Sequence, residues 1–325
     1  VGGAATSLIF GNLNSNGNVF LVNPNGILFG AGAQVDMPGL VASTLNISNA
    51  DFLAGNYKFQ TTGGLGSVMN GGTITVRNGG YLALLSPQVY NFGTIVADTG
   101  RVLLASGDAM TLNLDDAGDI SAVISDGTLN SLVSNTGNIT VGNGKVVLTA
   151  KSLNAVLDNI VNNTGIINAV NMVDDNGVVE LRASNGSVSN SGVIKSGTIR
   201  AVASEDVTNS GNLKATDLVR LQAGDDVINN NLIVSNDRVS IQATGDITNN
   251  GRMTTSATVM TDGTGHITDI GHLSYVSILS GLPIAPSTGS IGLSGQNIIQ
   301  TSGDLYTQKV TVTATGNVNL QNMVV

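Results

Sequence analysis

The apolar residues between Gly197 and Val276 recur with a period of about 20 residues. Each unit holds two or three short runs in which apolar and polar residues alternate, as in Val239, Ile241 and Ala243, and Gly, Asn and Asp separate the runs. Alternation at every second position predicts strands with one buried face, and the separating residues predict turns. Three short strands in about 20 residues predict one coil of a parallel β-helix.

Residues at the same place in successive units form columns, because neighbouring coils of such a fold stack about 4.8 Å apart. Aliphatic columns are expected to fill the interior with interlocking layers. One polar column, Asn209, Asn229 and Asn249, predicts a ladder of amide side chains that holds a sharp corner, and Asp269 is expected to end it. The four aliphatic columns are Ile199, Val219, Val239, Val259; Ala203, Ala223, Ala243, Gly263; Val207, Val227, Ile247, Ile267; and Leu213, Ile233, Met253, Leu273.

The segments before residue 186 repeat the same pattern with looser spacing. No helical period of useful length interrupts it, which excludes a sheet with crossover helices. We therefore predict an all-β fold: a single right-handed parallel β-helix with coils of about 20 residues. Insertions at Asp108–Asn130, Ser152–Asn162 and Ser280–Ser287 are expected to leave the coil as loops or small extra strands. Residues 1–185 and the more regular residues 186–325 are predicted to be two parts of one continuous solenoid.

The motif Asn23–Pro24–Asn25–Gly26 is predicted to be a turn between the strands Val19–Val22 and Ile27–Phe29. Pro presets its own φ, and Asn and Gly tolerate positive φ. With its flanking residues 15–30, 39–45 and 51–59, the motif resembles the secretion domain of two-partner secretion exoproteins of the filamentous-haemagglutinin and high-molecular-weight-adhesin type. The resemblance covers residues 1–185, and the regular repeats after them resemble the start of the family's shaft.

The resemblance implies that the chain is exported through the periplasm and outer membrane to the cell surface or the medium. Its partner is expected to be an outer-membrane β-barrel transporter, which the chain crosses in an extended form before it folds outside. Two roles stay open for residues 23–26: a corner that lets the first coils fold, or a direct contact with the transporter. The family has a capping segment before this motif, which we expect to lie upstream of Val1.

Composition supports a thin-layered secreted fold. The chain has 42 Gly, no Cys, no Trp and 3% aromatic residues, so short layers rather than a thick globular core must bury its apolar area. The net charge of −9 leads us to expect no basic patch, and therefore neither nucleic acid nor an anionic membrane surface as a partner. Receptors on host or bacterial surfaces are expected to contact regions beyond the C-terminus of this chain.

A β-helical carbohydrate-active enzyme, a lyase or glycosidase, is the alternative function. Such an enzyme needs two carboxylates facing one cleft about 5 to 10 Å apart. The acidic pairs at 115–116, 174–175 and 225–226 fall in turns, and adjacent residues face opposite ways on a strand. His266 and His272 occupy turn or surface columns without further zinc ligands nearby. We therefore expect no catalytic residue, cofactor or metal.

Overall fold

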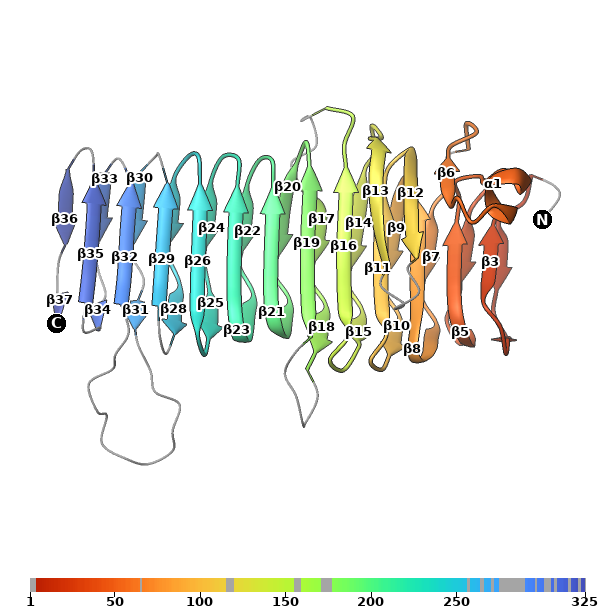
Figure 1. The fold of residues 1–325 in the computed structure, drawn as a ribbon, viewed down its shortest axis with the longest axis horizontal. Coiled ribbons are helices and arrows are strands. Elements are labelled where there is room, and N and C mark those ends of the chain that lie inside the picture. The colour runs from red at the N-terminus through yellow and green to blue at the C-terminus, as the bar shows by residue number, and fades with distance from the viewer. Residues whose placement is uncertain are drawn as a thin grey trace.

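The chain winds into an elongated solenoid in which strands follow one another along a single axis (Figure 1). The structure is a computed structural model. It describes residues 4–64, 66–114, 120–154, 159–170, 177–255, 258–263, 266–269, 272–274, 290–295, 297–300, 305–306, 309–314, 317–320 and 323–324.

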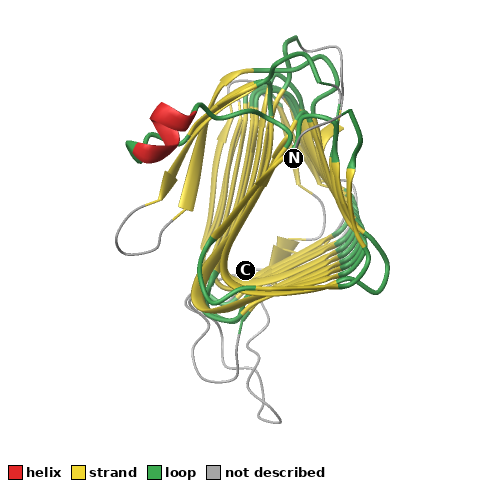
Figure 2. Cartoon of the chain, turned by 90° about the vertical axis from the view of Figure 1, so that its right-hand side faces the viewer, coloured by secondary structure: helices red, strands yellow, loops and turns green. Residues whose placement is uncertain are grey.

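Each coil contributes strands to three faces, which give the solenoid a roughly triangular cross-section (Figure 2). Face A is a parallel sheet of 13 short strands that pair in coil order. These strands are β1 (Ser7–Ile9), β4 (Ile27–Phe29), β7 (Val68–Asn70), β9 (Gln88–Asn91), β14 (Leu132–Asn135), β17 (Asn159–Asn163), β20 (Ser187–Asn190), β22 (Val207–Asn209), β24 (Val227–Asn229), β27 (Ile247–Asn249), β30 (His266–Asp269), β33 (Asn297–Gln300) and β36 (Val318–Leu320).

Faces B and C follow face A in each coil. Four long strands bend from face B to face C: β5 (Gln34–Ser43), β8 (Thr73–Ser86), β21 (Val193–Ala203) and β23 (Asn212–Ala223). The other strands of face B are β2 (Asn12–Asn14), β10 (Thr94–Ala97), β15 (Asn138–Thr140), β18 (Ile166–Ala169), β25 (Leu232–Ser235), β28 (Arg252–Thr255), β31 (His272–Ser274), β34 (Leu305–Tyr306) and β37 (Met323–Val324). Those of face C are β3 (Val19–Val22), β11 (Arg101–Ser106), β16 (Lys145–Lys151), β19 (Val178–Ser184), β26 (Arg238–Ala243), β29 (Thr258–Gly263), β32 (Ser290–Gly295) and β35 (Lys309–Ala314).

The parallel β-helix and its evenly spaced columns are confirmed. Val219 pairs in register with Val239 and Val239 with Val259, and the Ala, Val/Ile and Leu/Ile/Met columns align in the same way. The side chains of Val219 and Val239 are fully buried. One continuous apolar core therefore runs through the coils.

A second layer covers the outer side of face C over the first coils. It is an antiparallel sheet of β6 (Lys58–Gln60), β12 (Ala109–Leu114) and β13 (Ile120–Asp126), with the short helix α1 (Asn49–Leu53) beside it. We call these four elements the cover layer. The prediction that the insertion at Asp108–Asn130 forms extra strands is confirmed, because β12 and β13 lie within it. Part of the second insertion, residues 155–158, and the third insertion, Ser280–Ser287, lie outside the described residues.

The cover layer explains a change of chemistry along one outward-facing column of face C. Val41, Ala83, Leu103 and Val147 follow one another in register and are buried beneath the layer. The next position in the column is Glu180, where the layer ends. In this column the outward side chains are apolar in the four strands that the second layer covers.

Candidate functional site

The turn at residues 23–26 connects face C to face A between the first two coils. The N–H of Gly26 donates to the carbonyl of Asn23 at 3.0 Å, which closes the turn. The amide of Asn23 donates to the carbonyl of Ala5 at 3.0 Å and to Oγ of Ser7 at 2.9 Å. Its Oδ1 accepts the N–H of Asn25 at 3.0 Å. The Asn23 side chain therefore fastens its own turn to the preceding coil.

The next coil closes over the other side of this turn. The N–H of Ile27 donates to the carbonyl of Ser67 at 3.0 Å. A Cβ atom at Gly64 or Gly66 would lie 2.4 to 2.6 Å from the carbonyl oxygen of Pro24, so these two glycines permit close backbone contact. Gly26 has a φ of 116°, in the region that favours glycine. The turn is thus packed between its two neighbouring coils.

The four residues of the turn divide into a buried and an outer pair. Asn23 is 0% exposed and Gly26 is buried, whereas Pro24 is half-buried and Asn25 is exposed. Any partner that contacts the folded turn through side chains therefore meets Pro24 and Asn25.

Replacing Asn23 with alanine is expected to lower the free energy of unfolding by about 2–4 kcal/mol, because three hydrogen bonds are lost and buried groups stay unpaired. Replacing Asn25 with alanine is expected to cost less than about 1 kcal/mol, since its side chain is exposed. Chemical denaturation of the two variants measures the difference. Equal losses would contradict the division between a buried and an outer pair.

The three asparagines Asn209, Asn229 and Asn249 stack at the corner between faces A and B. The amide of Asn209 donates to Oδ1 of Asn229 at 2.8 Å, and the amide of Asn229 donates to Oδ1 of Asn249 at 2.7 Å. All three side chains are 1–2% exposed. Asp269 pairs with Asn249 through its backbone, and its side chain lies outside the described residues.

The ladder continues toward the N-terminus through five asparagines that sequence reasoning did not assign to it. Each amide donates to the next along the chain at 2.7 or 2.8 Å, from Asn70 to Asn209. The signal was present in the recurring Asn-x-Gly pattern, but irregular insertions make its spacing uneven, from 21 to 44 positions between the first five asparagines. The five residues are Asn70, Asn91, Asn135, Asn163 and Asn190.

Of the acidic pairs considered from the sequence, only Asp225–Asp226 lies within the described residues. Asp226 stacks between Asp206 and Asp246 at the corner from face C to face A. Its N–H donates to a carboxylate oxygen of Asp206 at 3.0 Å, and its own carboxylate accepts the N–H of Asp246 at 2.6 Å. These carboxylates bond the backbone of the adjacent coil and do not face each other across a cleft.

The charge of Asp226 and then partial burial raise the pKa of Asp225 above its ordinary value, and Asp206 and Asp246 add to the effect. A raised folded-state pKa means that the ionised group destabilises the fold above that pKa, and the cost disappears as pH falls through it. Replacing Asp225 with asparagine is therefore expected to raise the melting temperature slightly at pH 7 and not at pH 3. Thermal unfolding at both pH values, with and without 0.5 M salt, measures this, and a larger gain at pH 3 would contradict it.

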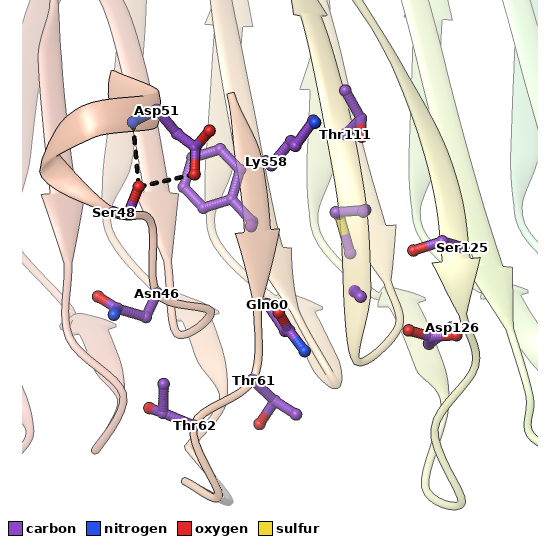
Figure 3. Close-up of a pocket in the computed structure, with 13 residues that line it drawn as sticks. Asn46, Ser48, Asp51, Lys58, Gln60, Thr61, Thr62, Thr111, Ser125 and Asp126 are labelled. Atoms are coloured by element: carbon purple, nitrogen blue, oxygen red, sulfur yellow. Dashed lines mark hydrogen bonds between the residues drawn. The ribbon is translucent and has the colours of Figure 1, made fainter. Parts of the chain in front are cut away.

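A polar cavity of about 400 Å³ opens between α1 and the cover-layer strands (Figure 3). Its two carboxylates come from separate elements, Asp51 of α1 and Asp126 at the end of β13. Ser48 donates its hydroxyl to Asp51 at 2.6 Å and accepts the Asp51 N–H at 3.0 Å, which caps the helix. The Asp51 carboxylate therefore takes part in the N-terminal cap of α1.

A further carboxyl, that of Asp108, lines a different cavity. Burial raises its pKa above the ordinary range, Asp126 adds to the rise, and a hydrogen bond with Thr128 opposes it. The charge of Asp126 thus acts on Asp108, although the two carboxyls line different cavities. This arrangement does not match the facing carboxylates of a glycosidase.

The remaining candidates carry no site in the described structure. The side chains of His266 and His272, and the acidic pairs at 115–116 and 174–175, lie outside the described residues. Among the residues that are described, no group of three or more His, Asp or Glu side chains is placed to hold a metal ion. No helix in this described part is long and apolar enough to span a bilayer.

Comparisons with known proteins point to one family. A family model described as the TPS secretion domain matches residues 1–196. Two heme/hemopexin-binding proteins of Haemophilus influenzae are 29% identical over 235 residues and 31% identical over 204 residues, which is 66% and 60% of this chain. The matches cover only 25% and 22% of those relatives. The crystal structure of the HMW1 secretion domain from Haemophilus influenzae superposes with a TM-score of 0.67 at 22% identity, covering 95% of this chain and 83% of that one.

Proposed function

Because the chain belongs to the TPS secretion domain family, in which exoproteins are exported across the outer membrane to the cell surface or the medium, we propose that it carries the signal recognised by a partner transporter. The partner is an outer-membrane β-barrel dedicated to this exoprotein. The match of the family model over residues 1–196 is the observation that carries the proposal. The burial of Asn23 and Gly26 supports a role for this motif in folding, and Pro24 and Asn25 remain accessible for contact with the transporter.

The coils after the cover layer form the start of a shaft that holds adhesive modules away from the cell. The regular stacking of β21 to β27 supports this proposal, because each coil buries its aliphatic columns against its neighbours. The chain spans about a quarter of the length of the curated relatives it matches, and surface attachment is proposed as an activity of the whole protein. The names of those relatives state that they bind haem and hemopexin. No feature among the described residues of this chain points to either activity.

Coil-by-coil folding outside the cell supplies the free energy that makes passage directional. Each coil that emerges completes hydrogen bonds to the coil before it, and it adds one amide to the asparagine ladder. Burial of its aliphatic side chains adds about 25 cal/mol for each Å² removed from water. No nucleotide is needed for such a process.

Co-production of the chain with and without its partner transporter tests the proposal. The chain, preceded by a signal peptide, is expected to reach the medium only when the transporter is present. Asn25→Ala is expected to reduce export while leaving the purified protein's melting temperature nearly unchanged. Transporter-independent release of the wild-type chain would contradict the recognition role. Undiminished export of a variant whose coils do not fold would contradict the folding-driven step.

A further inference from the structure

Face A differs from the other two faces of the solenoid in that its strands carry no charge. From β1 to β27, these strands contain no Asp, Glu, Lys or Arg, and neither do the turns that lead from them to face B. Charged side chains do lie on the other faces, for example Lys195 and Lys214 on face B and Arg200 on face C. Because the whole chain has a net charge of −9, face A is the surface across which two copies repel each other least.

The side chains that point outward from the first strands of face A are apolar. Leu8, Leu28, Met69 and Tyr90 follow one another in register on β1, β4, β7 and β9. Leu8 is 59% exposed and the other three are half-buried. The cover layer lies over face C in these coils, and no described helix or strand covers face A. These coils therefore present an apolar column to the solvent.

Two phenylalanines extend this apolar surface along the corner with face B. Phe10 and Phe92 are 61% and 53% exposed. A Cβ atom at Gly30 would lie 2.3 Å from the Phe10 ring, and one at Gly71 would lie 2.2 Å from the Phe92 ring. Each ring thus lies directly against the backbone of the adjacent coil, where only glycine leaves room for it. The rings therefore follow the corner and leave face A open to a flat partner.

Beyond β9 the outward column of face A becomes polar, but it stays uncharged. It continues in register through Ser134, Asn162, Ser189, Thr208, Ile228 and Thr248. With about 4.8 Å between strands, the face from β1 to β27 is about 43 Å long and about 12 Å wide. Two such faces pressed together bury about 1,000 Å², which is the lower bound for a specific protein interface.

We propose that face A is the interface of a weak homodimer, in which two copies of this chain pack side by side with the same polarity. A two-fold axis parallel to the solenoid axis places each coil opposite the same coil of the second copy. The apolar columns of the first coils then cover each other, and the uncharged polar columns meet farther along. A two-fold axis perpendicular to the solenoid would place the apolar coils opposite Thr208 and Thr248, which leaves the apolar surface poorly matched.

The acidic residues at one edge of face A also fit this arrangement. Asp206, Asp226 and Asp246 stack at the corner from face C to face A. In the parallel pair, this corner lies opposite the corner between faces A and B of the second copy, where the same coils carry the uncharged, exposed side chains of Ser210 and Asn230. The two rows of carboxylates therefore lie on opposite sides of the interface and do not meet.

Two double variants of the same coils test the assignment. Met69→Lys with Tyr90→Lys places charges on face A. Thr75→Lys with Val96→Lys is the matched control, because these two half-buried residues pair in register on the outer side of face B. Sedimentation velocity of the 325-residue chain at about 1 to 200 µM measures self-association, and circular dichroism checks that both variants fold.

The wild type is expected to dimerise reversibly with a dissociation constant of about 10 to 100 µM. Since the interface holds no ion pair, added NaCl is expected to leave the dimer unchanged or to strengthen it by screening the net charge. The face A variant is expected to dimerise about 20-fold more weakly or less, and the face B variant within about twofold of the wild type. A wild type that stays monomeric, or equal losses in the two folded variants, would overturn the proposal. A monomeric wild type that binds phosphatidylcholine vesicles through Met69 and Tyr90 would assign the face to lipid instead.

Chemical cross-linking tests the polarity of the pair. Packed sheets lie about 10 Å apart, so a bismaleimide with a spacer of about 8 Å is expected to join two copies of Thr208→Cys within the dimer. Val202→Cys, half-buried on the outer side of face C, is the control and is expected to stay unlinked. In the opposite polarity the two cysteines of Thr208→Cys lie several coils apart. A dimer in which Thr208→Cys does not cross-link would therefore overturn the parallel arrangement, and equal linkage of Val202→Cys would overturn the choice of face A.

Discussion

Replacing Asn135 with leucine is expected to lower the free energy of unfolding by about 3 kcal/mol or more. Asn135 is fully buried in the middle of the ladder, where it accepts from Asn91 and donates to Asn163, both at 2.7 Å. Leucine leaves the amide of Asn91 and the carbonyl oxygen of Asn163 without these partners. Each such buried polar group costs about 1–3 kcal/mol.

The neighbouring residue provides a matched control for the ladder. Thr136 follows Asn135 at the same corner and is exposed. Thr136→Ala is expected to change stability by less than about 0.5 kcal/mol. Urea denaturation of both variants measures the effect. A leucine variant as stable as the wild type would show that the aliphatic columns hold the corners without the amide ladder.

Replacing Phe59 with alanine is expected to cost about 3–5 kcal/mol, the range for a buried phenylalanine. Phe59 is 1% exposed at the centre of the second apolar cluster, opposite Met110 of β12. Its loss leaves a cavity between the cover layer and face C. Since the layer covers the apolar residues Leu103 and Val147, its loosening also exposes apolar surface that promotes aggregation.

Amide hydrogen exchange distinguishes loosening of the cover layer from unfolding of the whole solenoid. Exchange in β6, β12 and β13 is expected to accelerate strongly in Phe59→Ala, while β22 to β26 keep their protection. Leu53→Ala is the control, because Leu53 lies in α1 at 83% exposure. Unchanged exchange in β12 and β13 would show that Phe59 does not hold the layer in place.

The stacking was predictable because it depends on a period that the sequence shows directly. Val219, Val239 and Val259 are equally spaced, and that spacing defines a column as soon as the strands are parallel. The same reasoning aligned Asn209, Asn229 and Asn249. Strand periodicity and repeat length together are enough to predict the coil of the β-helix.

The cover layer was harder to predict from the sequence, because its contacts join segments that are far apart in the chain. The short strand β6 pairs with β12, which lies two coils later in the chain, and α1 has only five residues. Val41, Leu103 and Val147 make the outer side of face C apolar, so their strands are buried on both faces and lack a clean alternation. The sequence showed that residues 108–130 form an insertion, but it did not show which face of the solenoid the insertion packs against.

The roles within the turn also required the structure. Asn23 and Asn25 are the same residue type two positions apart, and both suit a turn. Only the folded chain shows that Asn23 faces Ala5 and Ser7 inside the corner whereas Asn25 faces outward.

Disulfide formation between engineered cysteines tests in-register stacking, the central claim, most directly. The chain has no cysteine, and Thr208 pairs with Ile228 and Ile228 with Thr248 on the outer side of face A. Adjacent parallel strands place paired Cα atoms about 4.8 Å apart, within the range for a disulfide, and strands two coils apart place them at about 9.6 Å, beyond it. Mild oxidation is predicted to link Thr208→Cys to Ile228→Cys within one chain and to leave Thr208→Cys with Thr248→Cys reduced. Equal linkage of the two pairs, or linkage of the second alone, would contradict the stacking of successive coils in register.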